Sequence, residues 1–311
     1  MTGASEGDRN GAGRVAGVLY VVATPIGNLE DLSPRAARVL READLIAAED
    51  TRRTRALLSA LGLRKRLVSY YDAIEERRSA ELVAELQRGA AVALVSDAGT
   101  PLVSDPGFRL VESARRRGVR VVAVPGPSAV LALLSCAGLP AVPFTFVGFL
   151  PARRPARRRV LVELRDRTDT LVCFESARRL AASLADMSAV FGEREAAVGR
   201  ELTKRHEEVL RGSLPELAAR FAASGPPKGE IVVAIAGGTR AAAREARAEG
   251  TERLLRSLLA AGVSVSEAAR RAAAESGLSR RELYGRALAL ARAAADAGPS
   301  PTKREKGGPA E

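Results

Sequence analysis

The sequence contains few of the residues from which metal sites and disulfide frameworks are built. Its 311 residues include one histidine, His206, two cysteines and no tryptophan. One histidine cannot form the clusters of imidazole ligands typical of many transition-metal sites, so we expect no bound metal. The cysteines, Cys136 and Cys173, are far apart in the sequence and lie among apolar residues. That setting is typical of buried free thiols in a reducing compartment, and no disulfide is implied.

Long apolar runs are also missing. No run approaches the roughly 20 residues that a transmembrane helix needs, and residues 1–17 lack the apolar segment of a secretory signal. We therefore expect a cytoplasmic protein with no membrane partner. The glycines of residues 1–17 precede the first strand-like run and cannot form a phosphate-binding turn after it, so these residues are interpreted as a disordered leader.

The charge is strongly unbalanced. Lysine and arginine number 49 against 37 acidic residues, which gives a net charge of +12. This excess favours a polyanionic partner such as a nucleic acid, although an arginine-rich surface without such a partner would also explain part of it. With 46% hydrophobic residues, the chain is long enough to build two domains around their own cores.

The first part of the chain alternates strand-like and helix-like patterns. The apolar, strand-like runs are Val18–Ala23, Leu45–Ala48, Leu67–Tyr70, Val92–Ser96 and Val119–Val124. Helical patterns lie between them, at Arg53–Leu61, Glu76–Gln87 and Phe108–Arg116. This order predicts an α/β domain over residues 18–126, with a parallel sheet covered by helices on both faces. Ligands of such sheets bind beyond the carboxyl ends of the strands.

The pattern changes in the remainder of the chain. Residues 127–238 predict a second α/β domain with a mixed sheet, in which Ser213 and Glu216 form a capping box before a helix. Residues 250–293 predict a small module resembling a helix-turn-helix. The tail over residues 298–311 is rich in proline, glycine, lysine and glutamate and is interpreted as disordered.

Three loops rich in glycine and proline follow strand-like runs. They belong to the segments Leu19–Leu29, Asp97–Gly107 and Pro125–Ala129. Taken alone, the second could be a proline-stiffened surface loop. Together, however, the three segments resemble the tetrapyrrole-methylase superfamily of methyltransferases. The resemblance extends from about Leu19 to about Leu290 and implies a two-domain tetrapyrrole-methylase fold with a C-terminal helical module.

The resemblance implies S-adenosylmethionine as the cofactor, held in a cleft between the two domains. Backbone groups of such loops, together with a carboxylate, can satisfy the polar groups of this molecule without crowding its methyl group. Transferred to this sequence, the cofactor-binding residues are Thr24, Pro25, Gly27, Asp97, Ala98, Gly99, Ser104, Ser128 and Ala129.

A fourth segment, Glu49–Thr54, resembles one branch of the superfamily. That branch methylates a ribose 2′-hydroxyl of 16S ribosomal RNA, at a cytidine of the decoding region, so the small ribosomal subunit is the implied partner. The segment could instead simply begin a helix, with Asp50 or Thr51 as its cap. We expect arginines after it and in a later basic run to contact phosphates. These are Arg52, Arg53, Arg55, Arg153, Arg154, Arg157, Arg158 and Arg159.

The sequence does not decide which group accepts the proton of the ribose hydroxyl. Candidates are Glu49, Asp50, Glu201 and Lys204, because carboxylates and amines are common proton acceptors. Members of the superfamily are commonly dimers, so a homodimer is expected. This chain departs from the branch at Tyr71, Ala73, Ile74, Ala177 and Arg178, where histidine, asparagine or proline is usual. Roles of those family histidines therefore cannot be transferred.

Two other functions share some of these features. A tetrapyrrole C-methyltransferase would have the same cleft loops, but it needs neither the +12 charge nor the helical module. A non-catalytic RNA-binding protein would have the charge but would not need the cofactor loops. The sequence favours the ribosomal RNA methyltransferase, since it accounts for both sets of features.

Overall fold

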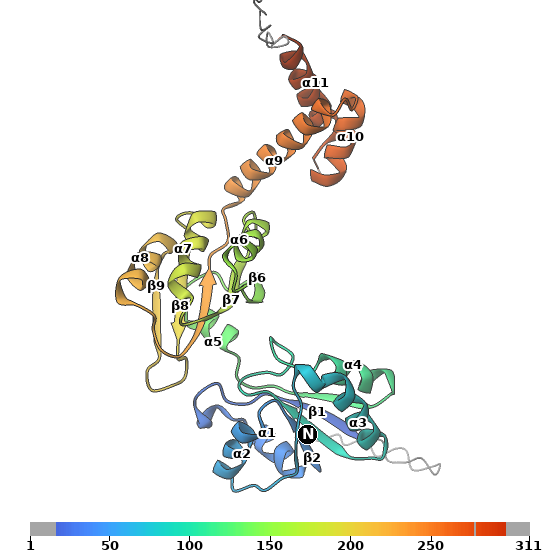
Figure 1. Ribbon diagram of the computed structural model, residues 1–311, viewed down its shortest axis with the longest axis vertical. Helices are drawn as coiled ribbons and strands as arrows, with labels where there is room; N and C mark the ends of the chain where they lie inside the picture. Colours follow the sequence, from blue (N-terminus) through green and yellow to red (C-terminus); the bar gives the residue numbers. More distant parts are fainter. Residues whose placement is uncertain (1–16, 277, 297–311) are drawn as a thin grey trace, which may run out of the picture. The chain divides into compact units, whose positions relative to one another are not determined.

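A computed structural model describes residues 17–276 and 278–296 of the chain (Figure 1). Apart from Gly17, the predicted leader and tail lie outside the described residues. The chain forms two compact units. The larger contains residues up to 165 and 169–237; the smaller contains residues 166–168 and the chain from 238 onward.

The first sheet of the larger unit is entirely parallel. Its strands run in the order β3-β2-β4-β1-β5. Their bounds are β1 (Val18–Val22), β2 (Leu45–Ala48), β3 (Leu67–Ser69), β4 (Ala91–Val95) and β5 (Arg120–Val124). Every strand predicted for this part of the chain is present, with bounds shifted by at most one residue. The order makes β4 a neighbour of both β1 and β2, so the loops that follow these three strands lie together.

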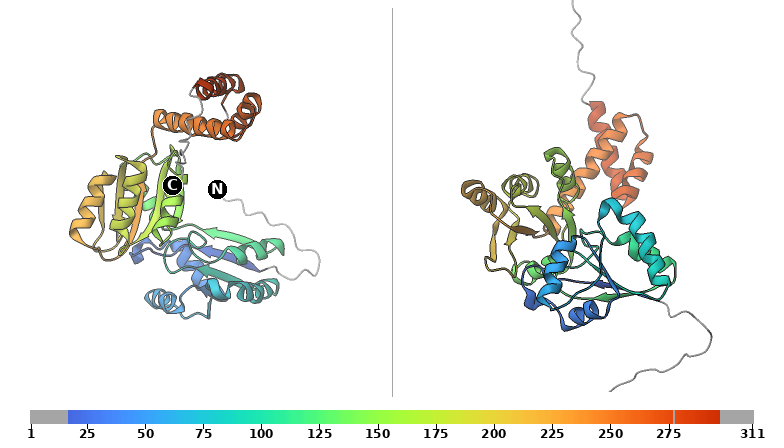
Figure 2. Two further views of the ribbon diagram at one scale, coloured as in Figure 1. Left: turned by 45° about the horizontal axis from the view of Figure 1, so that its top comes forward. Right: turned by 60° about the horizontal axis from the view of Figure 1, so that its bottom comes forward.

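Helices cover both faces of this sheet (Figure 2). They are α1 (Pro34–Glu42), α2 (Thr51–Ala60), α3 (Glu75–Gln87) and α4 (Phe108–Arg116), with short 3₁₀ turns η1 (Leu29–Asp31) and η2 (Asp72–Ile74). One core contains residues of α1 and α2, such as Leu40 and Leu58, and the other contains residues of α3 and α4, such as Leu86 and Leu110. Ser33 caps α1, since its hydroxyl accepts a hydrogen bond from the Ala36 amide at 3.0 Å.

The second sheet is mixed, as predicted. Its order is β6-β7-β10-β8-β9; β6 is parallel to β7, and the other pairs are antiparallel. The strands are β6 (Phe144–Phe149), β7 (Thr170–Ser176), β8 (Glu195–Arg200), β9 (Glu208–Ser213) and β10 (Glu230–Ile235). Its helices are α5 (Ala129–Cys136), α6 (Arg154–Glu163), α7 (Leu180–Phe191) and α8 (Leu214–Ser224).

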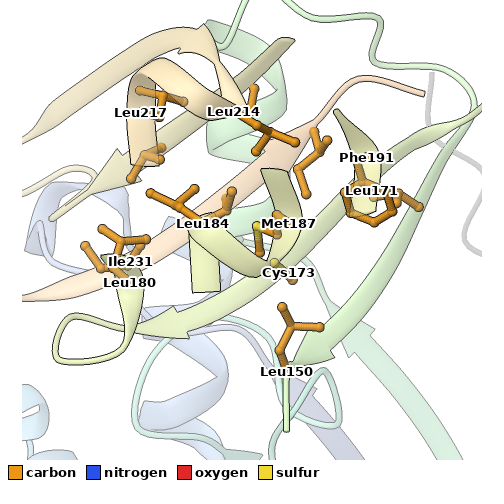
Figure 3. Packing of buried hydrophobic residues seen from close by; sticks show 14 of the residues in the cluster. Leu150, Leu171, Cys173, Leu180, Leu184, Met187, Phe191, Leu214, Leu217 and Ile231 are labelled. Carbon is orange, nitrogen blue, oxygen red and sulfur yellow. The ribbon is translucent and has the colours of Figure 1, made fainter. Parts of the chain in front are cut away.

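Each face of the second sheet has its own apolar cluster. On one face, Leu180, Leu184 and Met187 of α7 pack with Cys173 of β7 and Leu217 of α8 (Figure 3). On the other face, Leu133 and neighbouring residues of α5 pack against the sheet. The predicted capping box of Ser213 and Glu216 is present at the start of α8.

The basic run that begins at Arg153 contains Pro155 and enters helix α6, because proline is compatible with the first turn of a helix. One expectation about this part of the chain, the burial of both cysteines, needs correction. Cys173 is buried as expected, and burial raises the pKa of its thiol to about 12. Cys136 is exposed instead, because it ends α5 on a side of the helix that faces away from the sheet.

The smaller unit is helical. It consists of α9 (Arg240–Ala260), α10 (Val265–Ser276) and α11 (Arg280–Asp296). Its core is thin and is built mainly from alanines, together with Leu255 and Leu283. The predicted fold class, a two-domain α/β methylase fold with a C-terminal helical module, is confirmed. Among the described residues, no helix is both long enough and apolar enough to span a membrane.

Candidate active site

A cavity of about 430 Å³ lies at the carboxyl edge of the first sheet, within the larger unit. Loops of the first sheet form part of its wall, and strand ends of the second sheet form the rest. Six of the nine predicted cofactor-binding residues line it: Asp97, Ala98, Gly99, Ser104, Ser128 and Ala129. The parallel arrangement of β4 and β5, which both pair with β1, explains this, since the loops that follow these two strands leave the same edge of the sheet.

Thr24, Pro25 and Gly27 are not among the residues that line the cavity. Thr24 is buried and pairs with Gly99 through two backbone hydrogen bonds. Gly27 lies so close to Lys204 that a Cβ atom at Gly27 would overlap the lysine side chain. Thr24 therefore supports the wall of the cavity through the backbone of Gly99.

The loop from Asp97 to Gly107 has an unusual backbone. Gly99 has a φ of 79°, and the non-glycine residues Leu102 and Ser104 also lie in the left-handed region, at 73° and 71°. Such values are unfavourable for residues with a side chain and are maintained by the surrounding contacts. The Thr100 hydroxyl donates a hydrogen bond to the Pro127 carbonyl at 3.2 Å, and the Gly107 amide donates to Glu75 at 3.0 Å.

Three carboxylates gather where this loop meets the end of β2. Asp97 accepts a hydrogen bond from the Asp50 amide at 2.9 Å, and Glu49 accepts one from the Asp97 amide at 3.2 Å. Asp105 is the third, and all three line the cavity. Burial raises the pKa of Glu49 despite its hydrogen bond from the Asp97 amide. Burial, reinforced by the charge of Glu49, raises the pKa of Asp105 to about 6.

Asp50 lies outside the cavity wall, at the start of α2. Its side chain caps α2 by accepting a hydrogen bond from the Arg52 amide at 2.8 Å, and it forms an ion pair with the Arg52 guanidinium at 2.7 Å. These contacts lower the pKa of Asp50 to about 2. Asp50 is not a lining residue. The helix-cap interpretation of this segment is therefore correct for Asp50, while Glu49 beside it faces the cavity.

The other two candidate proton acceptors bind each other. Lys204 lies 2.8 Å from Glu201 and 3.1 Å from Glu230. Burial alone would lower the pKa of Lys204, but its bonds to these two carboxylates outweigh this effect and raise it. The same contacts lower the pKa of Glu201. Lys204 is thus held as a cation that links two segments of the second sheet.

The second sheet contributes lining residues that are not among the predicted cofactor-binding residues. Phe149 at the end of β6 and Phe174 in β7 line the cavity, with ring centroids 5.3 Å apart. Glu175, next to Phe174, is buried; it accepts hydrogen bonds from Ser183 and the Ser176 amide and pairs with Arg179 at 2.6 Å. The sequence signal for Phe149 is a large aromatic residue at the end of a strand-like run.

Seven of the eight predicted RNA-contacting arginines have exposed side chains; only Arg157 does not. Its guanidinium is buried, lies 2.7 Å from Asp186 of α7 and donates to the Ala152 carbonyl at 3.2 Å. Arg157 therefore cannot contact phosphates in this fold, and the prediction for this residue is wrong. The physical reason is that the first turn of α6 directs Arg157 toward Asp186 of α7, whereas Arg153, Arg158 and Arg159 are exposed.

Comparisons with known proteins agree with this architecture. Residues 18–218 match the family model described as Tetrapyrrole (Corrin/Porphyrin) Methylases. The chain is 50% identical over 273 residues to the ribosomal RNA small subunit methyltransferase I of Mesorhizobium japonicum, covering 88% of this chain and 92% of the relative. The chain belongs to the ribosomal RNA small subunit methyltransferase I family.

More distant members and solved structures extend this result. The family's protein from Mycobacterium tuberculosis is 46% identical over 300 residues, covering 95% of this chain and 99% of the relative. Residues 244–291 match a C-terminal helix-turn-helix domain model of the same family. A cobalt precorrin-4 methyltransferase of cobalamin biosynthesis has the same fold, with a TM-score of 0.54 and 17% identity, covering 72% of this chain and 97% of that chain.

Proposed function

We propose that this protein transfers the methyl group of S-adenosylmethionine to the ribose 2′-hydroxyl of a cytidine in the decoding region of 16S ribosomal RNA. Membership of the methyltransferase family supports methyl transfer from S-adenosylmethionine to ribosomal RNA. The choice of the ribose oxygen and of the cytidine rests on the sequence motifs. The small ribosomal subunit is the proposed partner, and the expected homodimer stays a prediction.

The observation that carries the proposal is the cavity itself. Its volume of about 430 Å³ falls within the range of sites for small molecules of this size. Two phenylalanine rings offer an apolar surface for a flat base, and the loop backbone at Ala98 offers hydrogen-bonding groups. Five carboxylates, Glu49, Asp97, Asp105, Glu175 and Glu230, surround the cavity and suit a cation. The residues present therefore fit a sulfonium cofactor.

The bound cofactor supplies an activated methyl group on a cationic sulfur. The work left to the protein is to position the ribose oxygen in line with the methyl carbon and the sulfur and to exclude water. The reciprocal bonds between Thr24 and Gly99 fix the backbone of Gly99, a residue of the cavity wall, to the loop that follows β1. Arg53 extends from the cavity wall toward the surface, where its exposed side chain can contact an RNA phosphate.

The two rival functions make different predictions for one experiment. The full-length protein is incubated with S-adenosylmethionine labelled in its methyl group and with small ribosomal subunits that lack the modification, and in parallel with a corrin precursor. We expect label in 16S ribosomal RNA, recovered after nuclease digestion as 2′-O-methylcytidine. Label in the corrin would establish the tetrapyrrole C-methyltransferase instead, and binding of subunits without transfer would establish a non-catalytic RNA-binding protein.

A further inference from the structure

Five carboxylates line the cavity, and only some of them form an ion pair with a basic side chain. Asp97 pairs with Arg53 at 3.4 Å, Glu175 with Arg179 at 2.6 Å and Glu230 with Lys204 at 3.1 Å. Within the described part of the chain, Glu49 and Asp105 form no ion pair. An ion pair stabilises the charged form of a carboxylate and makes it a weaker base. The two carboxylates without a cation are therefore the stronger candidates for accepting a proton.

Glu49 and Asp105 are engaged differently. Glu49 accepts the hydrogen bond from the Asp97 amide, so it helps to hold the loop that follows β4. Asp105 lies on the same loop directly after Ser104, whose φ of 71° turns the chain at the cavity wall. The charged groups that act on Asp105 are all acidic: Glu49 at the end of β2, Asp97 at the end of β4 and Asp72 of η2.

We propose that Asp105, in the wall of the cavity and without a paired cation, accepts the proton of the ribose 2′-hydroxyl during methyl transfer. This inference rests on the proposed function. The ribose oxygen forms a bond to the methyl carbon, while the carbon–sulfur bond breaks and its electron pair stays on sulfur. The hydroxyl proton passes to an Asp105 oxygen and is later released to water.

The electrostatic surroundings suit this role. A general base works best when its pKa lies near the working pH, because it is then both deprotonated and basic. Burial and the three acidic neighbours hold the pKa of Asp105 at about 6. Asp50, with a pKa of about 2 and no place in the cavity wall, does not meet these conditions. Lys204 is held as a cation by Glu201 and Glu230 and does not meet them either.

The first test removes the carboxylate. In the full-length protein, Asp105→Asn keeps the size of the side chain but cannot accept the proton. We expect the single-turnover rate of methyl transfer to small subunits, measured at saturating S-adenosylmethionine, to fall by about 10² to 10⁴, with the melting temperature unchanged. Asp105→Glu is expected to recover part of the rate. Asp31→Asn in η1 is the matched control, since it makes the same change at an exposed carboxylate outside the cavity.

The second test uses pH. A carboxylate base is inactive when protonated, so the wild-type rate should fall as the pH decreases through about 6. Glu49→Gln removes a negative neighbour and should move the midpoint of this fall to lower pH. A wild-type rate for Asp105→Asn would overturn the inference, as would an inactive Glu49→Gln beside an active Asp105→Asn. If the wild-type protein itself transfers no methyl group to subunits, the proposed function is what fails.

Discussion

Thr24 and Gly99 are hydrogen-bonded to each other in both directions through their main chains. The Thr24 amide donates to the Gly99 carbonyl at 2.8 Å, and the Gly99 amide donates to the Thr24 carbonyl at 3.0 Å. The pair joins the loop after β1 to the loop after β4. Thr24 thus contributes to the cavity without lining it, because it fixes the backbone of a residue that does.

The first prediction concerns Gly99→Val. Gly99 has a φ of 79°, and a Cβ atom there would lie 3.4 Å from Ile26. A β-branched residue is strained in this region by at least about 1–2 kcal/mol, so the loop should shift and cofactor affinity should fall. Calorimetric titration with S-adenosylmethionine measures the effect. Gly118→Val is the matched control, because Gly118 also has a positive φ, of 70°, but lies in open space between α4 and β5. Equal affinities in the two folded variants would contradict the prediction.

The second prediction compares two arginines that bind one carboxylate. Arg157 and Arg154 both pair with Asp186, but the Arg157 side chain is 4% exposed and the Arg154 side chain is 69% exposed. Arg157→Met leaves a buried carboxylate with one partner fewer and should lower the free energy of unfolding by up to about 3–5 kcal/mol. Arg154→Met should lower it by at most about 1 kcal/mol. Urea titration followed by circular dichroism tests both; similar losses would contradict the assignment of Arg157 to the core.

The ion pairs of Asp186 with Arg154 and Arg157 also predict how the stability of the fold depends on pH. Burial would raise the pKa of Asp186, but hydrogen bonds from Arg154 and Arg157 outweigh it, and the pKa lies below its ordinary value of 3.8. A carboxylate with a lowered pKa stabilises the fold above its unfolded pKa, and this contribution is lost as the pH falls through the folded value. The difference in unfolding free energy between wild type and Asp186→Asn should therefore be constant near neutral pH and decrease below about pH 4.

The third prediction concerns RNA binding by the exposed arginines of the basic run. Replacement of Arg153, Arg158 and Arg159 by serine should flatten the dependence of log affinity on log salt concentration, by about 0.7–0.9 for each phosphate that these arginines neutralise. Replacement of Arg35, Arg38 and Arg41, which are exposed on α1, removes the same charge elsewhere and is the control. Identical slopes for the two triple variants would show that only net charge matters.

The last prediction concerns the helical module. A chain that ends near Gly238 keeps every residue that lines the cavity, so it should bind S-adenosylmethionine with normal affinity. The module carries exposed arginines such as Arg253, Arg280 and Arg281, and its removal should weaken binding to the small subunit. Filter binding and methylation assays on both chain lengths test this. A failure to bind the cofactor would show that the module supports the cavity, and unchanged subunit binding would show that it has no docking role.

Local patterns predicted the elements of the first sheet well, because apolar runs and helix caps are encoded by neighbouring residues. Phe108–Arg116 and Leu45–Ala48 have the bounds that the sequence predicted. Six cavity residues were also predicted, since two of the three motifs follow β4 and β5, which end at one edge of a parallel sheet. Such an edge collects loops that are far apart in the chain.

The remaining features depend on contacts between distant residues. The burial of Arg157 depends on Asp186, which is 29 residues later and one helix away. Phe149 and Phe174 approach the cavity because β6 and β7 are paired, and strand pairing cannot be read from either segment alone. Asp105 does not stand out in the sequence, because Pro106 and Gly107 beside it are typical of an ordinary turn. The charges of Glu49 and Asp72, which act on Asp105, come from other segments of the chain.

The order of the first sheet has a consequence for the nascent chain. β1 is made first, yet its two neighbours are β4, which begins at Ala91, and β5, which ends at Val124. During synthesis, β1 therefore has no strand to pair with until β4 has been made, and β2 and β3 can pair with each other before then. Such non-local pairing slows folding and leaves strand edges open. β1, whose following loop contains Thr24, is therefore among the last strands of this sheet to be paired.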